Sequence, residues 1–400
     1  MNTKSKILGI LAAGVFAASA HAADDQLVDT LVRNGFITQA QADSMKADSK
    51  SKSDKPSVSP KRKTTASMNA KVRLHWQVGY ASVDSDYSDA NTESYFTFEN
   101  RRVRVGFDGK MNNNWKFDVF ANVLPEGSNL DTGTLTYTGI DNIDIGFGFT
   151  DMEVGREEST SSSSIKTVER SLLANTFDGP RSTGVFADAG FGPVSVFAGL
   201  FNGVSDNDNA LEGDGSTKVA GNFQIFLNLG EIFDGIKGDI GFQTNQFFDS
   251  DNADFDAVYS INGELKFGMF GIQADYIWGE DQGGDTTQGF MIMPYVSVTD
   301  NLELVFRYDY IDSDKKNGIG VLSRYVGRTA LDDAINTDEG SNAGEADDGN
   351  EYQSFYFGAN YYISGNNLKL QAGVELSELK DDNITAMEST TVYGAVRARF

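Results

Sequence analysis

Apolar and polar residues alternate along most of the chain from residue 66 onward. In residues 66–80 the apolar positions are Ala70, Val72, Leu74, Trp76, Val78 and Tyr80. The positions between them are Lys71, Arg73, His75, Gln77 and Gly79. A period of two indicates a β-strand with two different faces. Charged residues opposite a fully apolar face are typical of a strand that lies between lipid and a water-filled lumen.

The same alternation predicts sixteen strands. They cover 66–80, 94–108, 114–124, 132–140, 143–150, 183–191, 193–202, 218–229, 236–248, 255–267, 269–279, 288–298, 302–312, 352–363, 367–378 and 389–400. An even number suits a single-chain bacterial barrel. We therefore expect an all-β fold: a 16-stranded antiparallel transmembrane β-barrel over 66–400, with a short N-terminal periplasmic helical segment.

The connections between these strands alternate in length. Tight turns are expected at 109–113, 141–142, 192, 299–301 and 364–366. Longer polar loops lie between them, at 81–93, 125–131, 151–182, 203–217, 249–254, 280–287, 313–351 and 379–388. Short periplasmic turns and long external loops are the pattern of outer-membrane barrels, and they place both termini in the periplasm.

The last predicted strand ends on Phe400 and should close the barrel against the strand of residues 66–80. Pairing there would bring Arg397 and Arg399 onto the lumen face that carries Lys71 and Arg73. A terminal aromatic residue also resembles the assembly signal of outer-membrane barrels.

Two segments depart from strict alternation. The apolar positions change parity between Phe98 and Val103, which predicts a β-bulge near Glu99–Arg101. Pro294 interrupts another lipid-facing set and predicts a local irregularity or a subunit contact, because proline cannot donate to the strand ladder.

The N-terminus has the features of an export signal over residues 1–22: Lys4 and Lys6, an apolar core, and Ala20-His21-Ala22 as a cleavage site. Residues 23–65 are expected to form two short helices and a basic linker. The linker is either a spacer or an element that contacts the cell wall.

Composition narrows the function classes. The formal net charge of −25 argues against nucleic-acid binding, which needs a basic surface. The chain has no cysteine, so no disulfide or thiolate metal site is possible. His75 is the only histidine after the signal and lies in mid-strand, which makes a catalytic histidine site a weak hypothesis. We expect no enzymatic activity and no cofactor.

A basic wall is predicted on the inward faces of the first three strands. Its candidate pore-lining residues are Lys71, Arg73, His75, Arg102, Arg104 and Lys116. Charged rings at a constriction set ion preference, so this wall would attract anions. The alternative is that these cations pair with inward acids such as Asp108 and Asp118 and carry no selectivity.

The loop at 151–182 is the candidate constriction, because a long loop after the fifth strand can fold into the barrel. Its charged candidates are Glu153, Arg156, Glu157, Lys166, Glu169 and Arg170. The alternative is a solvated external loop. The acidic loop at 313–351 can bind divalent cations that bridge to lipopolysaccharide phosphates, or it is simply a solvated surface.

Several segments resemble the phosphate-selective porin O and P family. They are Phe98-Glu99-Asn100-Arg101-Arg102 with the Gly turn and Trp115 that follow, Val168-Glu169-Arg170-Ser171, Leu200-Phe201-Asn202-Gly203, Phe306-Arg307-Tyr308-Asp309 and Gly358-Ala359-Asn360-Tyr361-Tyr362. The resemblance spans roughly 66–400. It implies a homotrimeric, sixteen-stranded porin with a general or anion-preferring channel. The serine-rich, glutamate-bearing loop departs from a dedicated basic phosphate site.

The sequence therefore predicts a porin in the outer membrane of a Gram-negative cell. Such a protein forms a passive aqueous channel for small hydrophilic solutes and ions, with phosphate as one candidate, and contacts membrane lipid and lipopolysaccharide. The alternative is a structural outer-membrane barrel tethered to the cell wall through residues 23–65.

Overall fold

The computed structural model describes residues 32, 33, 38–40, 43, 66–84, 93–124, 127–203, 219–248, 254–321, 348–382 and 384–400. The chain separates into two compact units, Met1–Lys63 and Thr64–Phe400. The export signal expected over 1–22 lies outside the described residues, as does most of 23–65, so both stay predictions. Within the described part of the chain, no helix is long and apolar enough to cross a membrane.

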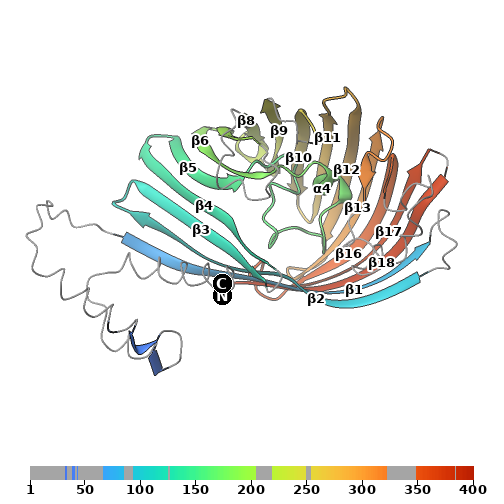
Figure 1. Cartoon of the computed structure of the whole chain (residues 1–400), viewed down its shortest axis with the longest axis horizontal. Coiled ribbons are helices and arrows are strands. Elements are labelled where there is room, and N and C mark those ends of the chain that lie inside the picture. Colours follow the sequence, from blue (N-terminus) through green and yellow to red (C-terminus); the bar gives the residue numbers. More distant parts are fainter. Residues whose placement is uncertain are drawn as a thin grey trace, which may run out of the picture. The chain divides into compact units, whose positions relative to one another are not determined.

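The strands of the second unit form one closed antiparallel barrel (Figure 1). The first eight are β1 (Ala66–Asp84), β2 (Glu93–Met111), β3 (Trp115–Leu124), β4 (Gly127–Ile140), β5 (Ile143–Asp151), β6 (Arg181–Phe191), β7 (Val194–Asn202) and β8 (Val219–Asn228). The last eight are β9 (Lys237–Phe248), β10 (Ala257–Phe267), β11 (Phe270–Glu280), β12 (Thr286–Ser297), β13 (Leu302–Ser313), β16 (Glu351–Tyr362), β17 (Leu368–Asp381) and β18 (Ile384–Arg399). Among the described residues, this confirms the expected barrel of sixteen strands.

Among the described residues of the second unit, four small elements lie outside the barrel ladder. They are the helix α4 (Leu172–Thr176), the 3-10 turn η1 (Leu229–Glu231) and a separate pair of two-residue strands, β14 (Ile319–Gly320) and β15 (Asp348–Gly349). The pair lies within the predicted loop 313–351. Most of that loop's acidic residues fall in 322–347, outside the described residues, so cation binding there stays untested.

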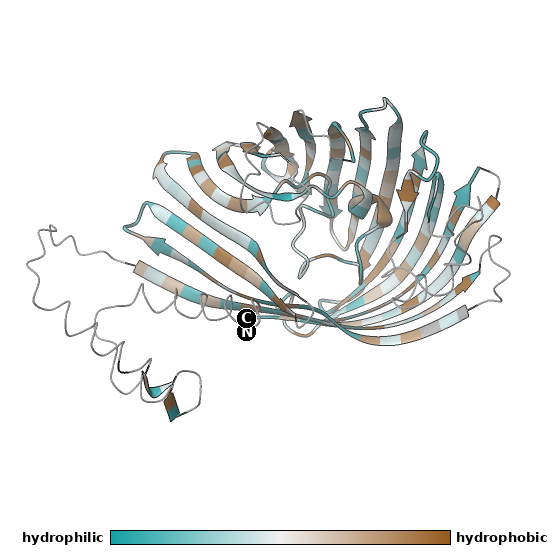
Figure 2. Ribbon diagram, in the orientation of Figure 1, coloured by the Kyte–Doolittle hydropathy of each residue, from teal (hydrophilic) through white to brown (hydrophobic). Residues whose placement is uncertain are grey.

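The distribution of polarity across the barrel wall is inverted relative to a soluble protein. On β17 the exposed side chains Leu370, Val374 and Leu376 alternate with the buried Gln371 and Glu375. Figure 2 shows the same alternation of hydrophobic and hydrophilic residues along the other strands. An apolar outer face and a polar inner face are what lipid outside and water inside require.

The barrel closes between β18 and β1, as the sequence predicts. Arg399 pairs with Arg73, and Arg397 pairs with His75. Phe400 continues the seam: its carbonyl accepts from the Val72 amide at 2.7 Å, and its own amide donates to the Val72 carbonyl at 3.1 Å. The last residue is therefore part of the closing ladder.

Both predicted irregularities occur. The register of β1 against β2 shifts between His75 and Trp76, so that Arg101 is the extra residue of a β-bulge. Between β12 and β13 the pairing is interrupted where Pro294 would face Phe306. The bulge returns Phe98 and Val103 to the outer face and leaves Arg101 free to turn inward.

Two of the predicted long loops prove wrong. β4 begins at Gly127 rather than residue 132, and β18 begins at Ile384 rather than residue 389. The expected loops at 125–131 and 379–388 are therefore mostly strand. Strand pairing continues past the lipid-facing zone, where the outer face no longer has to be apolar and the alternation that marks a strand is lost.

Candidate functional site

The connection between β5 and β6 folds into the barrel. Residues 152–180, called the inward loop from here on, cross the lumen in Figure 1. Inward side chains of the wall donate hydrogen bonds to its carbonyls. Asn245 donates to Met152 at 2.8 Å, and Lys369 donates to Ile165 at 2.6 Å. A loop buried in this way needs donors from the wall because it has no ladder of its own.

A buried ion cluster fixes the middle of the inward loop to β13 and β17. The guanidinium of Arg307 is fully buried and lies 3.4 Å from Glu157 of the loop. It also lies 3.4 Å from Asp309 and 3.3 Å from Glu375. Glu157 in turn accepts from the amide of Ser171 at 2.8 Å, at the start of α4. The loop is thus held by one cation surrounded by three carboxylates.

The last part of the inward loop, which contains α4, is held by apolar packing. Leu172 and Leu173 of α4 and the adjacent Phe177 are buried in a cluster with Met291 of β12. The Phe177 ring also stacks on Phe255 at 5.1 Å between centroids. Buried apolar side chains are unusual inside a porin lumen, and here the inward loop contributes several of those in this cluster.

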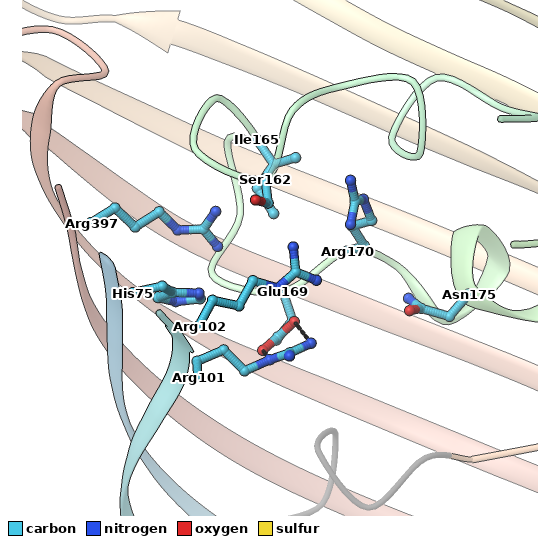
Figure 3. A pocket seen from close by; sticks show the side chains of 9 residues that line it. All are labelled: His75, Arg101, Arg102, Ser162, Ile165, Glu169, Arg170, Asn175 and Arg397. Atoms are coloured by element: carbon cyan, nitrogen blue, oxygen red, sulfur yellow. Dashed lines mark hydrogen bonds and ion pairs between the residues drawn. The ribbon is translucent and has the colours of Figure 1, made fainter. Parts of the chain in front are cut away.

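A cluster of cations forms where the inward loop meets β1, β2 and β18 (Figure 3). We call this the basic cluster; it consists of His75, Arg101, Arg102, Arg170 and Arg397, with Glu169 as its acid. Arg101 Nε lies 2.7 Å from Glu169 Oε1. The cluster encloses a cavity of about 10 Å³, which is room for about one water molecule.

Arg101 pairs with Glu169, and Arg170 lies 3.3 Å from Glu158, so the four guanidinium groups of the basic cluster face two carboxylates and keep a positive excess. Arg397 donates to the Val168 carbonyl at 2.5 Å. His75 is buried, and its Nε2 has no hydrogen-bond partner among the described residues. Arg102 faces Arg101, Arg104 and Arg170 and forms no ion pair within the described part of the barrel. The cluster therefore attracts negative charge.

The predicted basic wall is divided by the structure. Three of its cations pair with acids, as the alternative interpretation holds. Lys71 lies 2.9 Å from Asp108 and 3.6 Å from Asp118. In the same way, Arg104 lies 2.9 Å from Asp131, and Lys116 lies 3.0 Å from Asp144. Arg73 instead lies over the Phe120 ring, at 4.5 Å. Only His75 and Arg102 belong to the basic cluster.

The six candidates on the inward loop are also separated. Glu157 belongs to the ion cluster around Arg307, and Glu169 and Arg170 belong to the basic cluster. Lys166 lies 3.4 Å from Glu303 and 3.8 Å from the Tyr295 ring centre. Glu153 and Arg156 line a different cavity, against β7, β8 and β9. The six residues therefore lie at several separate places along the loop.

Glu153 has an altered proton affinity. Burial raises the pKa of its carboxyl to about 7, and the negative charge of Asp151 adds to the effect. The carboxyl thus changes its charge near neutral pH, inside the lumen.

Sequence reasoning missed the anchoring residues Arg307, Asp309 and Glu375. The sequence does predict that these side chains face inward; Arg307, for example, alternates with the apolar Phe306 and Tyr308. Their role was not visible, because it depends on which part of the inward loop rests on β13 and β17. Among the described residues, no group of three or more His, Cys, Asp or Glu side chains is arranged so that it could hold a metal ion.

Comparison with known proteins agrees with this architecture. The family model described as phosphate-selective porin O and P matches residues 68–223. This range includes the Arg101-Arg102 and Glu169-Arg170-Ser171 segments, whereas the segments quoted from residue 306 onward lie outside it. No match was found among curated proteins.

Solved structures share the fold at low identity. An anion-selective porin from Comamonas acidovorans has 11% identity and a TM-score of 0.54, over 84% of this chain and 100% of that one. OprB from Pseudomonas putida has 9% identity and a TM-score of 0.57, over 83% of this chain and 94% of that one. The outer membrane channel DcaP of Acinetobacter baumannii has 12% identity and a TM-score of 0.51, over 84% of this chain and 97% of that one. Residues 68–223 are thus similar to the phosphate-selective porin O and P family, and the barrel has the fold of these solved porins.

Proposed function

We propose that the protein is a passive outer-membrane channel for small hydrophilic solutes and ions, with a preference for anions. One observation carries the anion preference: the positive excess of the basic cluster, where Arg102 lacks a carboxylate partner. A cation in a partly desolvated lumen acts over several ångströms because screening by salt is weak there. The cavity of the cluster is small, so the cluster acts through its field on the neighbouring lumen.

The proposal includes a homotrimer set in outer-membrane lipid and lipopolysaccharide, with both chain termini in the periplasm. The orientation is supported by the short turns at the end where β18 finishes, such as Gly192-Pro193 between β6 and β7. The inward loop leaves from the opposite end. The trimer follows from the family resemblance, and chemical cross-linking of the purified protein tests it.

Reconstitution of the full chain in planar lipid bilayers tests the channel itself. We expect stepwise conductance from the folded protein; correctly folded barrels that conduct no ions would contradict the proposal. The reversal potential in a gradient of potassium chloride then gives the ion preference. Adding phosphate as the competing anion shows whether it is preferred over chloride.

A pair of variants links the preference to the basic cluster. Arg102→Gln should reduce the anion-to-cation permeability ratio. Lys110→Gln removes the same charge from the same strand, eight positions nearer the turn after β2, and should change the ratio much less. Equal effects of the two substitutions would mean that overall charge, and not the basic cluster, sets the preference.

A further inference from the structure

The inner wall of β6, β7 and β8 carries phenylalanine side chains where a water-filled lumen favours polar ones. Phe186 stacks on Phe197 with ring centroids 5.6 Å apart and on Phe201 with centroids 6.4 Å apart. Phe226 lies on the same face, since its partner across the strand pairing, Ser195, is two residues from Phe197. We call these four residues the aromatic row.

Glycines on neighbouring strands make room for the rings. A Cβ atom on Gly146 would lie 2.1 Å from Phe186, and one on Gly241 would lie 2.3 Å from Phe226. The Phe186 and Phe226 rings therefore lie over these glycines, against the wall. Phe186, Phe197 and Phe226 are each partly exposed, whereas Phe201 is covered by Met152 of the inward loop.

A cavity of about 550 Å³ adjoins the aromatic row, between the inward loop and the ends of β7, β8 and β9. Phe226 forms part of its surface. Its uncharged polar lining comes from Gln224, Asn228, Ser159 and Ser195. A few fixed hydrogen-bonding groups around an apolar surface are typical of a solute site, and the volume lies in the usual range for one.

The charged groups of this cavity are Arg156, Asp239 and Glu153, which lack the positive excess of the basic cluster. Arg156 lies 2.5 Å from Asp239, and its guanidinium is 6.0 Å from the Phe226 ring centre. Apart from the Glu153 carboxyl, the remaining polar groups are amides and hydroxyls, which both donate and accept hydrogen bonds. Burial raises the pKa of Glu153 to about 7, so below that pH the cavity carries no net charge. It favours a neutral solute with one apolar face and several hydroxyl groups.

We propose that this cavity and the aromatic row form a subsite for neutral sugars in pyranose form. The C–H face of a pyranose ring packs on Phe226, and its ring-edge hydroxyls reach Gln224, Asn228 and the Arg156–Asp239 pair. The inference rests on the proposed channel function and adds a solute class to it. The subsite slows such a solute in transit and raises its local concentration without closing the path for ions.

Single-channel recording with maltotriose tests the subsite. Maltotriose added to one side of a bilayer that contains the full chain should produce reversible, saturable interruptions of the ion current. Phe226→Ala should weaken this binding by about fivefold to tenfold, the size expected for loss of a ring contact, and Phe226→Trp should retain it. The control Phe223→Ala removes a lipid-facing ring from the same strand and should change nothing.

The outcomes separate this inference from the proposed function. A protein without ion conductance contradicts the channel itself. A conducting channel that maltotriose does not interrupt overturns only the sugar subsite, and so does a Phe226→Ala channel with unchanged maltotriose affinity. If benzoate interrupts the current and maltotriose does not, the cavity takes aromatic acids and the inference is wrong.

Discussion

Arg101 and Glu169 form an ion pair inside the barrel, with 2.7 Å between Arg101 Nε and Glu169 Oε1 and 3.3 Å between Nη2 and Oε2. Arg101 is the extra residue of the β-bulge in β2, and Glu169 lies on the inward loop. The bulge therefore does two things at once. It keeps the outer face apolar, and it turns a cation inward to hold the loop against β2.

Breaking this pair should loosen the inward loop. Arg101→Gln leaves Glu169 largely buried without its main cation, at a local cost of about 3 kcal/mol. We expect larger current noise and more frequent transitions between conductance levels in single-channel recordings. The double variant Arg101→Glu with Glu169→Arg exchanges the two charges and should lower the current noise again in part. If the noise of Arg101→Gln equals that of the unmodified channel, the pair does not restrain the loop.

The ion cluster around Arg307 should matter more for the position of the loop. Arg307→Met leaves Glu157, Asp309 and Glu375 buried together without a cation, which costs roughly 3–5 kcal/mol. We expect the inward loop to detach and become cleavable by trypsin at Lys166 and Arg170 in folded protein.

The control for that experiment is Arg73→Met, which removes an inward arginine that lies over Phe120. Its inward loop should stay resistant to trypsin. Equal resistance of the two variants would show that the Arg307 cluster is not needed to hold the loop. Migration on a gel with and without heating shows whether each barrel is folded.

Ion preference should depend on pH near neutrality because of Glu153. Burial raises the pKa of Glu153 to about 7, so the carboxyl is neutral below that pH and negative above it. Anion preference should therefore fall as pH rises through about 7. Reversal potentials measured about one pH unit below and about one pH unit above the pKa of Glu153 test this. In Glu153→Gln the anion preference should depend less on pH. If it depends on pH as strongly as in the unmodified channel, another group is titrating.

The position of the rings in the aromatic row should depend on the glycines that they cover. Gly146→Ala places a Cβ atom 2.1 Å from the Phe186 ring and pushes the ring into the lumen. We expect a loss of roughly 1–3 kcal/mol from overpacking and a smaller single-channel conductance. Gly190→Ala is the control, since a Cβ atom there meets nothing within 4 Å. Equal heat stability and conductance of the two variants would contradict the proposed packing.

The local alternation of residues was sufficient to predict the barrel. A strand between lipid and water must show a period of two, so 66–80 and 367–378 could be read without any tertiary contact. The bulge near Arg101 was predicted in the same way, because a lipid-facing arginine is too costly to leave in place. Pairing of β18 with β1 followed from closure, since a barrel in lipid cannot leave an open edge.

The arrangement inside the lumen was decided by tertiary structure alone. The alternation along each strand predicts that its inward side chains include Lys71, Arg102, Arg307 and Phe226. It does not predict which of them the inward loop covers. The path of that loop through the barrel is irregular and follows no period. It determines that Arg307 becomes a buried anchor, while Arg102 stays without a carboxylate and Phe226 stays open to a cavity. Alternation along a strand encodes two faces, whereas partners across a lumen depend on loop packing between residues far apart in the chain.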